Sequence, residues 1–166
     1  MATALFITRE DIVRNTALNG SVDTDKFIQF IKIAQEIHLL NFMGTDLYDK
    51  ISAEIIAGTL AGDYLALTNN YLQPMLIHWA MVEYMPFAAY TIANGGVYKH
   101  TSESSVSVDK DEVDFLVEKE RKLADHYTDR FVNYMCYNDT LFPEYNSNTN
   151  DDTYPSKETQ TGGWVL

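Results

Sequence analysis

The stretch KDEVDFLVEKERKLADHYTDRFVNYMCYN, residues 110–138, decides the predicted fold of this chain. Its apolar residues recur every three or four positions and so lie on one side of a helix, opposite the charged residues. At about 1.5 Å per residue this helix is roughly 40 Å long, a length typical of a helical bundle. Its apolar stripe comprises Val113, Leu116, Val117, Leu123, Ala124, Tyr127, Phe131, Tyr134 and Met135.

Two helices are predicted near the N-terminus. Thr8 can cap the first, with Asp11 at the third helical position in a variant of the capping box, and Asn19-Gly20 ends it with a turn. The second covers about 25–43, where apolar residues follow the same three-and-four spacing. Gly44 then supplies a residue suited to the left-handed conformation at a helix end.

Two more helices are expected before the long one. Thr45 is predicted to cap the third, which Gly58 helps to end. The fourth is expected over about 68–93, with a kink at Pro86 because proline removes one backbone hydrogen bond. Residues 97–108 are expected to be an extended loop or a small hairpin arm. The predicted fold class is therefore all-α, a bundle of about five helices with an extended C-terminal tail.

The composition changes after residue 142. Residues 146–158 are almost entirely polar and cannot bury enough apolar surface to fold alone. We therefore divide the chain into a helical bundle domain, 1–142, and an extended C-terminal docking arm, 143–166. The residues predicted to bind a partner are Phe142, Tyr145, Tyr154, Gly162, Gly163, Trp164, Val165 and Leu166. The alternative is that the aromatic side chains among them fold back onto the bundle.

Charge and cysteine content exclude several classes of protein. Twelve Lys and Arg residues against 24 Asp and Glu residues give a net charge of -12, which argues against a surface that neutralises phosphates. Cys136 is the one cysteine of the sequence, so neither a disulfide framework nor a cysteine-based zinc site within one chain is expected. The N-terminus lacks the basic region of a secretory signal, and no membrane segment is predicted.

Catalytic motifs are not found in the sequence. Its histidines are His38, His78, His100 and His126, and no two are three or four residues apart. We therefore expect no catalytic residue, no cofactor, no metal and no enzymatic activity. The alternative hypothesis is a small helical-bundle enzyme that depends on a metal held by His38, His78 and nearby carboxylates.

Several stretches of the chain are similar to small virion proteins of tailed phages, including crAss-like phages and other phages of Bacteroidetes hosts. These stretches are FITREDI (6–12), NGSVD (19–23), IKIAQEIH (31–38), LNFMGTDL (40–47), NGGV (94–97), DEVD (111–114), LFPEY (141–145) and GGW (162–164). Together they extend over nearly the whole chain. The proteins that they resemble are head-tail connectors, also called adaptor or head-completion proteins.

The resemblance implies a helical bundle that assembles as a twelve-subunit ring beneath the portal protein, extends the DNA channel and offers the tail a docking surface. Expected partners are the portal, neighbouring copies, and tail or further ring proteins. DNA would pass through the lumen without specific binding, and an acidic wall would favour this by repelling phosphates. The implied location is the head-tail junction of the virion, after synthesis in the host cytoplasm. Other virion or host-interaction proteins, including a tail-completion protein or a regulatory adaptor, are the remaining alternatives.

Overall fold

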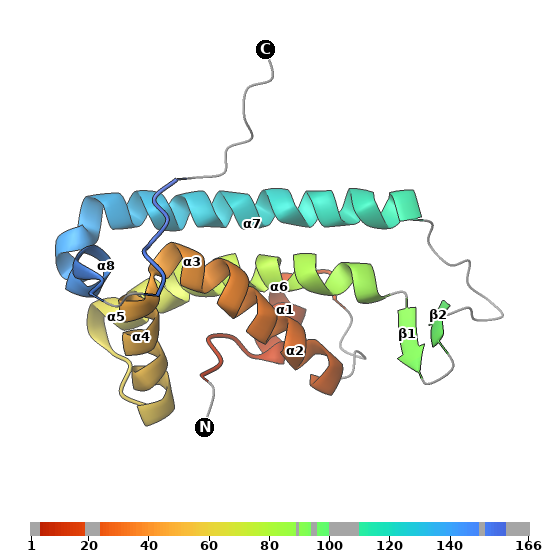
Figure 1. Cartoon of the computed structure of the whole chain (residues 1–166), viewed down its shortest axis with the longest axis horizontal. Helices are drawn as coiled ribbons and strands as arrows, with labels where there is room; N and C mark the ends of the chain where they lie inside the picture. Colours follow the sequence, from red (N-terminus) through yellow and green to blue (C-terminus); the bar gives the residue numbers. More distant parts are fainter. Residues whose placement is uncertain are drawn as a thin grey trace, which may run out of the picture.

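The structure is a computed structural model that describes residues 4–18, 24–88, 90–93, 96–99, 110–149 and 152–158. Its α-helices are α1 (Arg9–Asn15), α2 (Thr24–Ala34), α3 (Leu40–Met43), α4 (Thr45–Ala57), α5 (Gly62–Leu67), α6 (Gln73–Ala88), α7 (Lys110–Asn138) and α8 (Pro143–Ser147). Two π-helical segments, η1 (Gln35–Leu39) and η2 (Thr68–Leu72), and a 3₁₀ turn, η3 (Asp139–Leu141), join some of them. The all-α helical bundle predicted from the sequence is thus confirmed (Figure 1).

The π-helical segments turn separate helices into longer continuous ones. In η1 the Leu40 N–H donates to the Gln35 carbonyl five residues earlier, so the helix from Thr24 to Met43 is unbroken. In η2 the Gln73 N–H likewise donates to the Thr68 carbonyl, directly before Pro74, which has no N–H for the α-helical ladder. The second predicted helix, about 25–43, is therefore confirmed.

The fourth predicted helix, about 68–93, has wrong boundaries. The continuous helix begins at Gly62 and ends at Ala88, two residues after Pro86, which has no N–H to extend the helical ladder. The chain then enters an antiparallel hairpin of β1 (Tyr90–Ala93) and β2 (Gly96–Lys99). The hairpin lies earlier than the extended loop or hairpin arm predicted over 97–108: β2 overlaps that segment, β1 falls within the predicted fourth helix, and residues 100–108 lie outside the described part.

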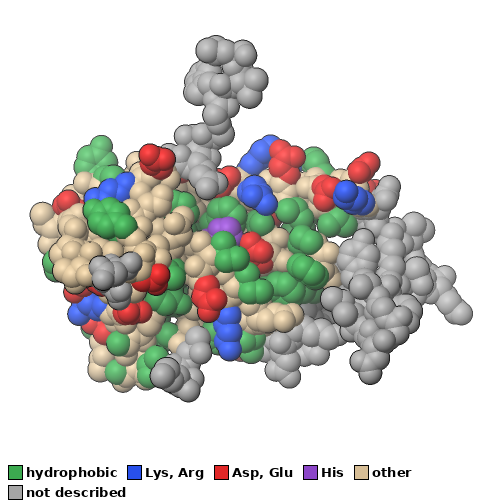
Figure 2. Space-filling model, viewed as in Figure 1, with side chains coloured by type: hydrophobic (Ala, Val, Ile, Leu, Met, Phe, Trp, Pro, Cys, Tyr) green, Lys and Arg blue, Asp and Glu red, His purple; other side chains and the backbone are tan. Residues whose placement is uncertain are grey.

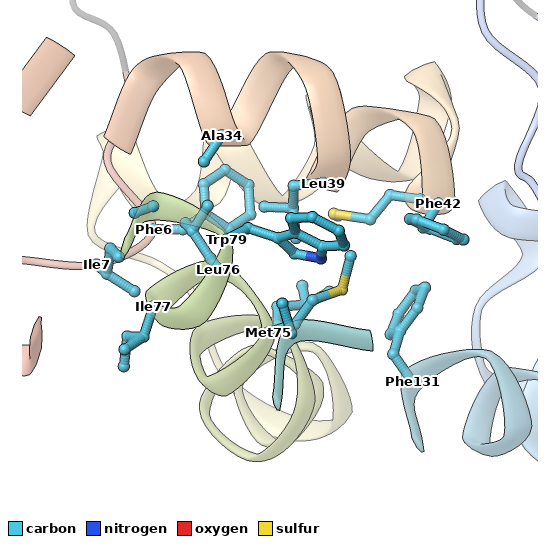
Figure 3. Packing of buried hydrophobic residues seen from close by; sticks show 14 of the residues in the cluster. Phe6, Ile7, Ala34, Leu39, Phe42, Met75, Leu76, Ile77, Trp79 and Phe131 are labelled. Atoms are coloured by element: carbon cyan, nitrogen blue, oxygen red, sulfur yellow. The ribbon is translucent and has the colours of Figure 1, made fainter. Parts of the chain in front are cut away.

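Helix α6 is the centre of the bundle. All eight residues from Met75 to Val82 are buried, because α2 and η1 pack on one side of α6 and α7 on another. Figure 3 shows the Trp79 indole at this junction, close to Leu39 and Met75. A helix that is apolar all round is stable in water only when its neighbours cover it in this way. None of the described helices has the length and hydrophobicity that crossing a membrane requires.

The first helix begins as its sequence predicts. The Thr8 N–H donates to Asp11 Oδ2 at 2.7 Å, and the Asp11 N–H donates to Thr8 Oγ1 at 3.3 Å. This reciprocal capping box satisfies two N–H groups that the first helical turn leaves unpaired. The helix ends at Asn15, before the predicted turn at residues 19–20, which lie outside the described part.

Candidate functional site

Residues 152–158 form a segment that we call the C-terminal strap, and it closes the N-terminus of α4. The Thr45 N–H donates to the Thr153 carbonyl at 3.0 Å, and the Thr153 N–H donates to Thr45 Oγ1 at 2.9 Å. The Asp46 N–H donates to Asn148 Oδ1 at 3.0 Å. The prediction that Thr45 caps α4 is wrong, because Thr45 is its first helical residue and groups about a hundred positions later supply the acceptors.

The strap packs closely against Gly44. Its φ of 76° favours glycine, and a Cβ added there would lie 2.5 Å from the Cγ of Pro155. One residue further on, the Ser156 N–H donates to the Asn41 carbonyl at 2.9 Å. The strap is therefore ordered on α3 and α4 in spite of its polar composition, because backbone hydrogen bonds and one buried proline hold it there.

Two of the predicted partner-binding side chains lie in the core. Phe142 and Tyr145 are almost completely buried, Phe142 against Tyr64 at 5.3 Å and Tyr145 against Phe131 at 6.2 Å between ring centroids. The structure corrects the prediction that both contact a partner, and residues 143–147 are helical instead of extended. Aromatic rings this close to the end of α7 gain more from burial in their own chain than from exposure to water.

The remaining predicted partner-binding residues have different outcomes. Tyr154 is exposed on the strap, as a residue in contact with a partner would need to be. Gly162, Gly163, Trp164, Val165 and Leu166 lie outside the described residues.

A cavity of about 290 Å³ lies between the η1–α3 segment and α7. Its floor is a stacked pair of rings, His38 and Trp79, whose centroids are 3.8 Å apart and whose planes differ by 10°. The remaining lining residues are Ile37, Asn41, Phe42, Arg121, Asp125, Thr128 and Asp129. The Thr128 hydroxyl already makes two hydrogen bonds within the chain, since it accepts one from the Trp79 indole N–H at 3.0 Å and donates one to the Ala124 carbonyl.

Burial determines the protonation of the groups around this cavity. It lowers the pKa of His38, although the Glu83 carboxylate, 2.9 Å from His38 Nε2, acts in the opposite direction. Burial also raises the pKa of both Asp125 and Asp129, while the Arg121 guanidinium partly offsets the effect on Asp125. The cavity therefore joins a neutral imidazole, two half-buried carboxyl groups and one cation on an aromatic floor.

His78 forms a second pair on the other side of α6. Its Nδ1 lies 2.6 Å from Glu120 Oε1, and its ring stacks on Tyr127 at 5.1 Å. The two histidine–glutamate pairs connect α6 to η1 and to α7. Within the described residues no group of three or more His, Cys, Asp or Glu side chains is placed to hold a metal ion.

The N-terminal half of α7 exposes apolar side chains that its sequence pattern assigns to the core. Leu116 and Leu123 belong to the predicted stripe, but both are exposed, and so is their neighbour Phe115. Figure 2 shows acidic and basic side chains along this part of α7, with hydrophobic side chains between it and the helices below. Along the stripe, full burial begins at Ala124, and Val117 before it is partly buried against the core.

Sequence reasoning missed the cavity residues on α7. Arg121, Asp125 and Asp129 stand four residues apart and so share one side of the helix, but the same pattern is common on solvated helix faces. Nothing in the sequence marks the position of η1 and α3 beside them. This charged face of α7 forms a cavity wall because η1 and α3, about eighty residues earlier in the chain, pack beside it.

The fold and this site define a small helical-bundle protein with a strapped C-terminal segment and a polar cavity on an aromatic floor. Residues 39–155 match a family of unknown function, DUF6712. Because the match extends over more than half of the 166 residues, the chain belongs to this family. The matched residues run from the end of η1 through most of the strap and contain the cavity residues from Asn41 onward, but not Ile37 and His38. No curated protein and no solved structure matches the chain.

Proposed function

We propose that this protein is a structural virion subunit of the head-tail connector ring, which docks beneath the portal, extends the DNA channel and joins the capsid to the tail. The observation that carries the proposal is the strap. Its hydrogen bonds to Asn41 and Thr45 hold the chain in place up to Ser156. A partner-binding segment at 162–166, which contains one large aromatic and two aliphatic side chains, would therefore start from a defined position. A ring subunit needs such a segment at a defined position, since each copy must reach its neighbour in the same way.

Two further features support the proposal. The β1–β2 hairpin lies beyond the end of α6 (Figure 1). A two-stranded hairpin has two open edges and is marginally stable alone, so contact with a neighbouring protein would stabilise it. The net charge of -12 suits the wall of a channel through which DNA must slide without binding.

Co-expression with the portal protein of the same phage, followed by cryo-electron microscopy of the purified complex, tests this function. We expect a closed ring of twelve copies on the tail-facing side of the portal. A chain that stays monomeric and unbound in the presence of the portal and its tail partners would overturn the proposal.

A variant that lacks residues 159–166 sharpens the test. We expect it to lose ring formation while its circular dichroism spectrum remains that of the intact bundle, because the described core packing is made by residues 4–158. Loss of the helical signal would show that the segment belongs to the fold and not to an interface.

A further inference from the structure

Two carboxyl groups in the cavity have no hydrogen-bond or ion-pair partner in the described part of the chain, although the Arg121 charge acts on Asp125 and the His126 charge on Asp129. Asp125 and Asp129 are half-buried on the α7 wall, and neither accepts a hydrogen bond nor forms an ion pair there. A carboxyl group that loses water on burial and gains no hydrogen bond is destabilised. A ligand that donates a hydrogen bond to it would replace the lost water contacts and offset this cost. The aromatic floor favours a donor that also carries a flat apolar surface.

The charge of the lining favours a neutral occupant. Arg121 lies on the same wall and already lowers the pKa of Asp125, so a cationic ligand would meet a like charge at that side. A purely anionic ligand would face both aspartates. An indole combines one N–H donor with a large aromatic surface and no charge, which matches both the carboxyl groups and the stacked His38 and Trp79 rings.

The chain itself contains a segment of this chemistry. Residues 159–166, TQTGGWVL, carry no charged side chain, and Trp164 follows two glycines that let the backbone turn closely. The segment begins directly after the strap. Ser156, near the end of the strap, donates its N–H to the carbonyl of Asn41, and Asn41 lines the cavity. Eight residues reach at most about 29 Å when extended.

The direction of the strap favours a second copy over the same copy. In Figure 1 the strap runs from the α3–α4 junction and crosses α7 in this view, so its described end lies beyond α7 from α3. A segment that continued in this direction would have to reverse to enter the cavity of its own chain, whereas it could enter the cavity of a second copy without reversing.

We propose that Trp164 of one copy occupies the cavity between η1–α3 and α7 of a second copy, with its indole N–H donated to Asp125 or Asp129. This inference rests on the proposed function, because it requires neighbouring copies side by side. Each copy then offers one segment and one cavity on different surfaces. Such a contact is heterologous, and heterologous contacts close into rings when the rotation between subunits permits.

Photo-crosslinking of the full-length chain tests the contact. With benzoylphenylalanine in place of Trp164, irradiation should give crosslinked dimers and longer ladders, and mass spectrometry should map the bonds to Ile37, Asn41 or Arg121. Crosslinks confined to single chains would overturn the assignment to a second copy. Crosslinks mapped outside the cavity, or no crosslink at all, would overturn the cavity itself.

A matched pair of variants checks that the cavity is the receiving surface. Ile37 lines the cavity and Ile56 does not, while the two side chains are 56% and 54% exposed. Ile37→Asp should reduce the crosslinked fraction at least about tenfold, and Ile56→Asp should leave it unchanged. Equal losses in both variants would contradict the proposal.

A second matched pair concerns the segment. In the unlabelled chain, Trp164→Ala should weaken self-association about tenfold or more, whereas Tyr137→Ala, a change of an exposed aromatic near the end of α7, should have little effect. Rings on the portal without cavity crosslinks would refute this inference and leave the proposed function intact. Cavity crosslinks between copies that never bind the portal would support this inference and refute the proposed function.

Discussion

The two halves of α7 have the same kind of sequence and different surroundings. In the C-terminal half, Ala124, Phe131 and Met135 are buried, while in the N-terminal half Phe115 and Leu116 are exposed. The difference lies in what covers them. Phe142, α8 and the strap fold back near the C-terminal half, with Tyr145 against Phe131, and Phe142 against Tyr64 and near Tyr134. An apolar stripe therefore shows that a helix has a face to cover, and the rest of the chain decides how much of it is covered.

The largest expected effect contrasts one phenylalanine from each half. Phe131→Ala removes a fully buried ring and should lower the free energy of unfolding by about 3–5 kcal/mol, measured by urea denaturation. Phe115→Ala removes a ring that is 59% exposed and should change it by no more than about 0.5 kcal/mol. A large loss from Phe115→Ala in the isolated chain would mean that this half is covered after all.

The next effect concerns the cover itself. Gly44→Ala places a Cβ against Pro155 at a positive φ, so it should dislodge the strap and cost more than about 1 kcal/mol of stability. Limited proteolysis should then cut within residues 149–158. Gly58→Ala is the control for a positive φ, 67°, with no atom within 4 Å of the new Cβ. Because ψ is 160° at Gly44 and 26° at Gly58, the backbone cost differs between the two variants, so the proteolytic cut reports the strap and the stability difference does not. If Gly44→Ala were cut within residues 149–158 no faster than Gly58→Ala, the strap would not depend on Gly44.

A third prediction concerns pH and the cavity where the two halves of α7 meet. Burial lowers the pKa of His38 in the folded chain, so the unfolded chain, with a pKa of about 6.5, binds the proton more tightly. The free energy of unfolding should therefore fall as pH drops from about 7.5 to about 5.5, by about 1.4 kcal/mol for each unit by which the folded pKa is lowered.

The variant His38→Gln should show a shallower decrease over the same range, measured by urea denaturation at each pH. The raised pKa of Asp125 has the opposite effect on the free energy of unfolding, because the folded chain binds that proton more tightly. This effect falls at lower pH, near the range where carboxyl groups titrate. An unchanged slope in the histidine variant would show that another group dominates this range.

The smallest effect is expected on the solvent side of the N-terminal half. Lys122 pairs with Glu118 at 3.0 Å, but both side chains are more than 60% exposed. Lys122→Ala should therefore change the melting temperature hardly at all, consistent with a contribution below about 0.5 kcal/mol. A clear loss of stability in the monomer would indicate that these charges are less hydrated than their exposure implies.

Local signals predicted much of the fold. The bounds of α7, from Lys110 to Asn138, and the capping box of α1 follow from spacing and from side chains within three residues of each other. The second helix was also predictable, although its π-helical segment was not. The start at Gly62 was missed because glycine is a typical helix breaker, and the end at Ala88 because apolar residues continue beyond Pro86.

The candidate site was far less predictable. His38 could be singled out as a histidine on an apolar stripe, but its partners Glu83 and Trp79 come from α6, more than forty residues away. Phe142 and Tyr145 have the composition of an interface and the position of core residues. Their burial depends on α7 ending beside α5, which the local pattern does not encode.

The sequence by itself determined that the chain is helical, acidic and apolar along one side of a long final helix, because these properties depend on composition and on neighbours within one or two turns. Only the tertiary structure decided which part of that apolar side is covered, where the strap lies and that a cavity forms over the His38–Trp79 stack. These outcomes depend on contacts between residues more than a hundred positions apart, such as Thr45 with Thr153. Such contacts form only when several helices bury their apolar faces together.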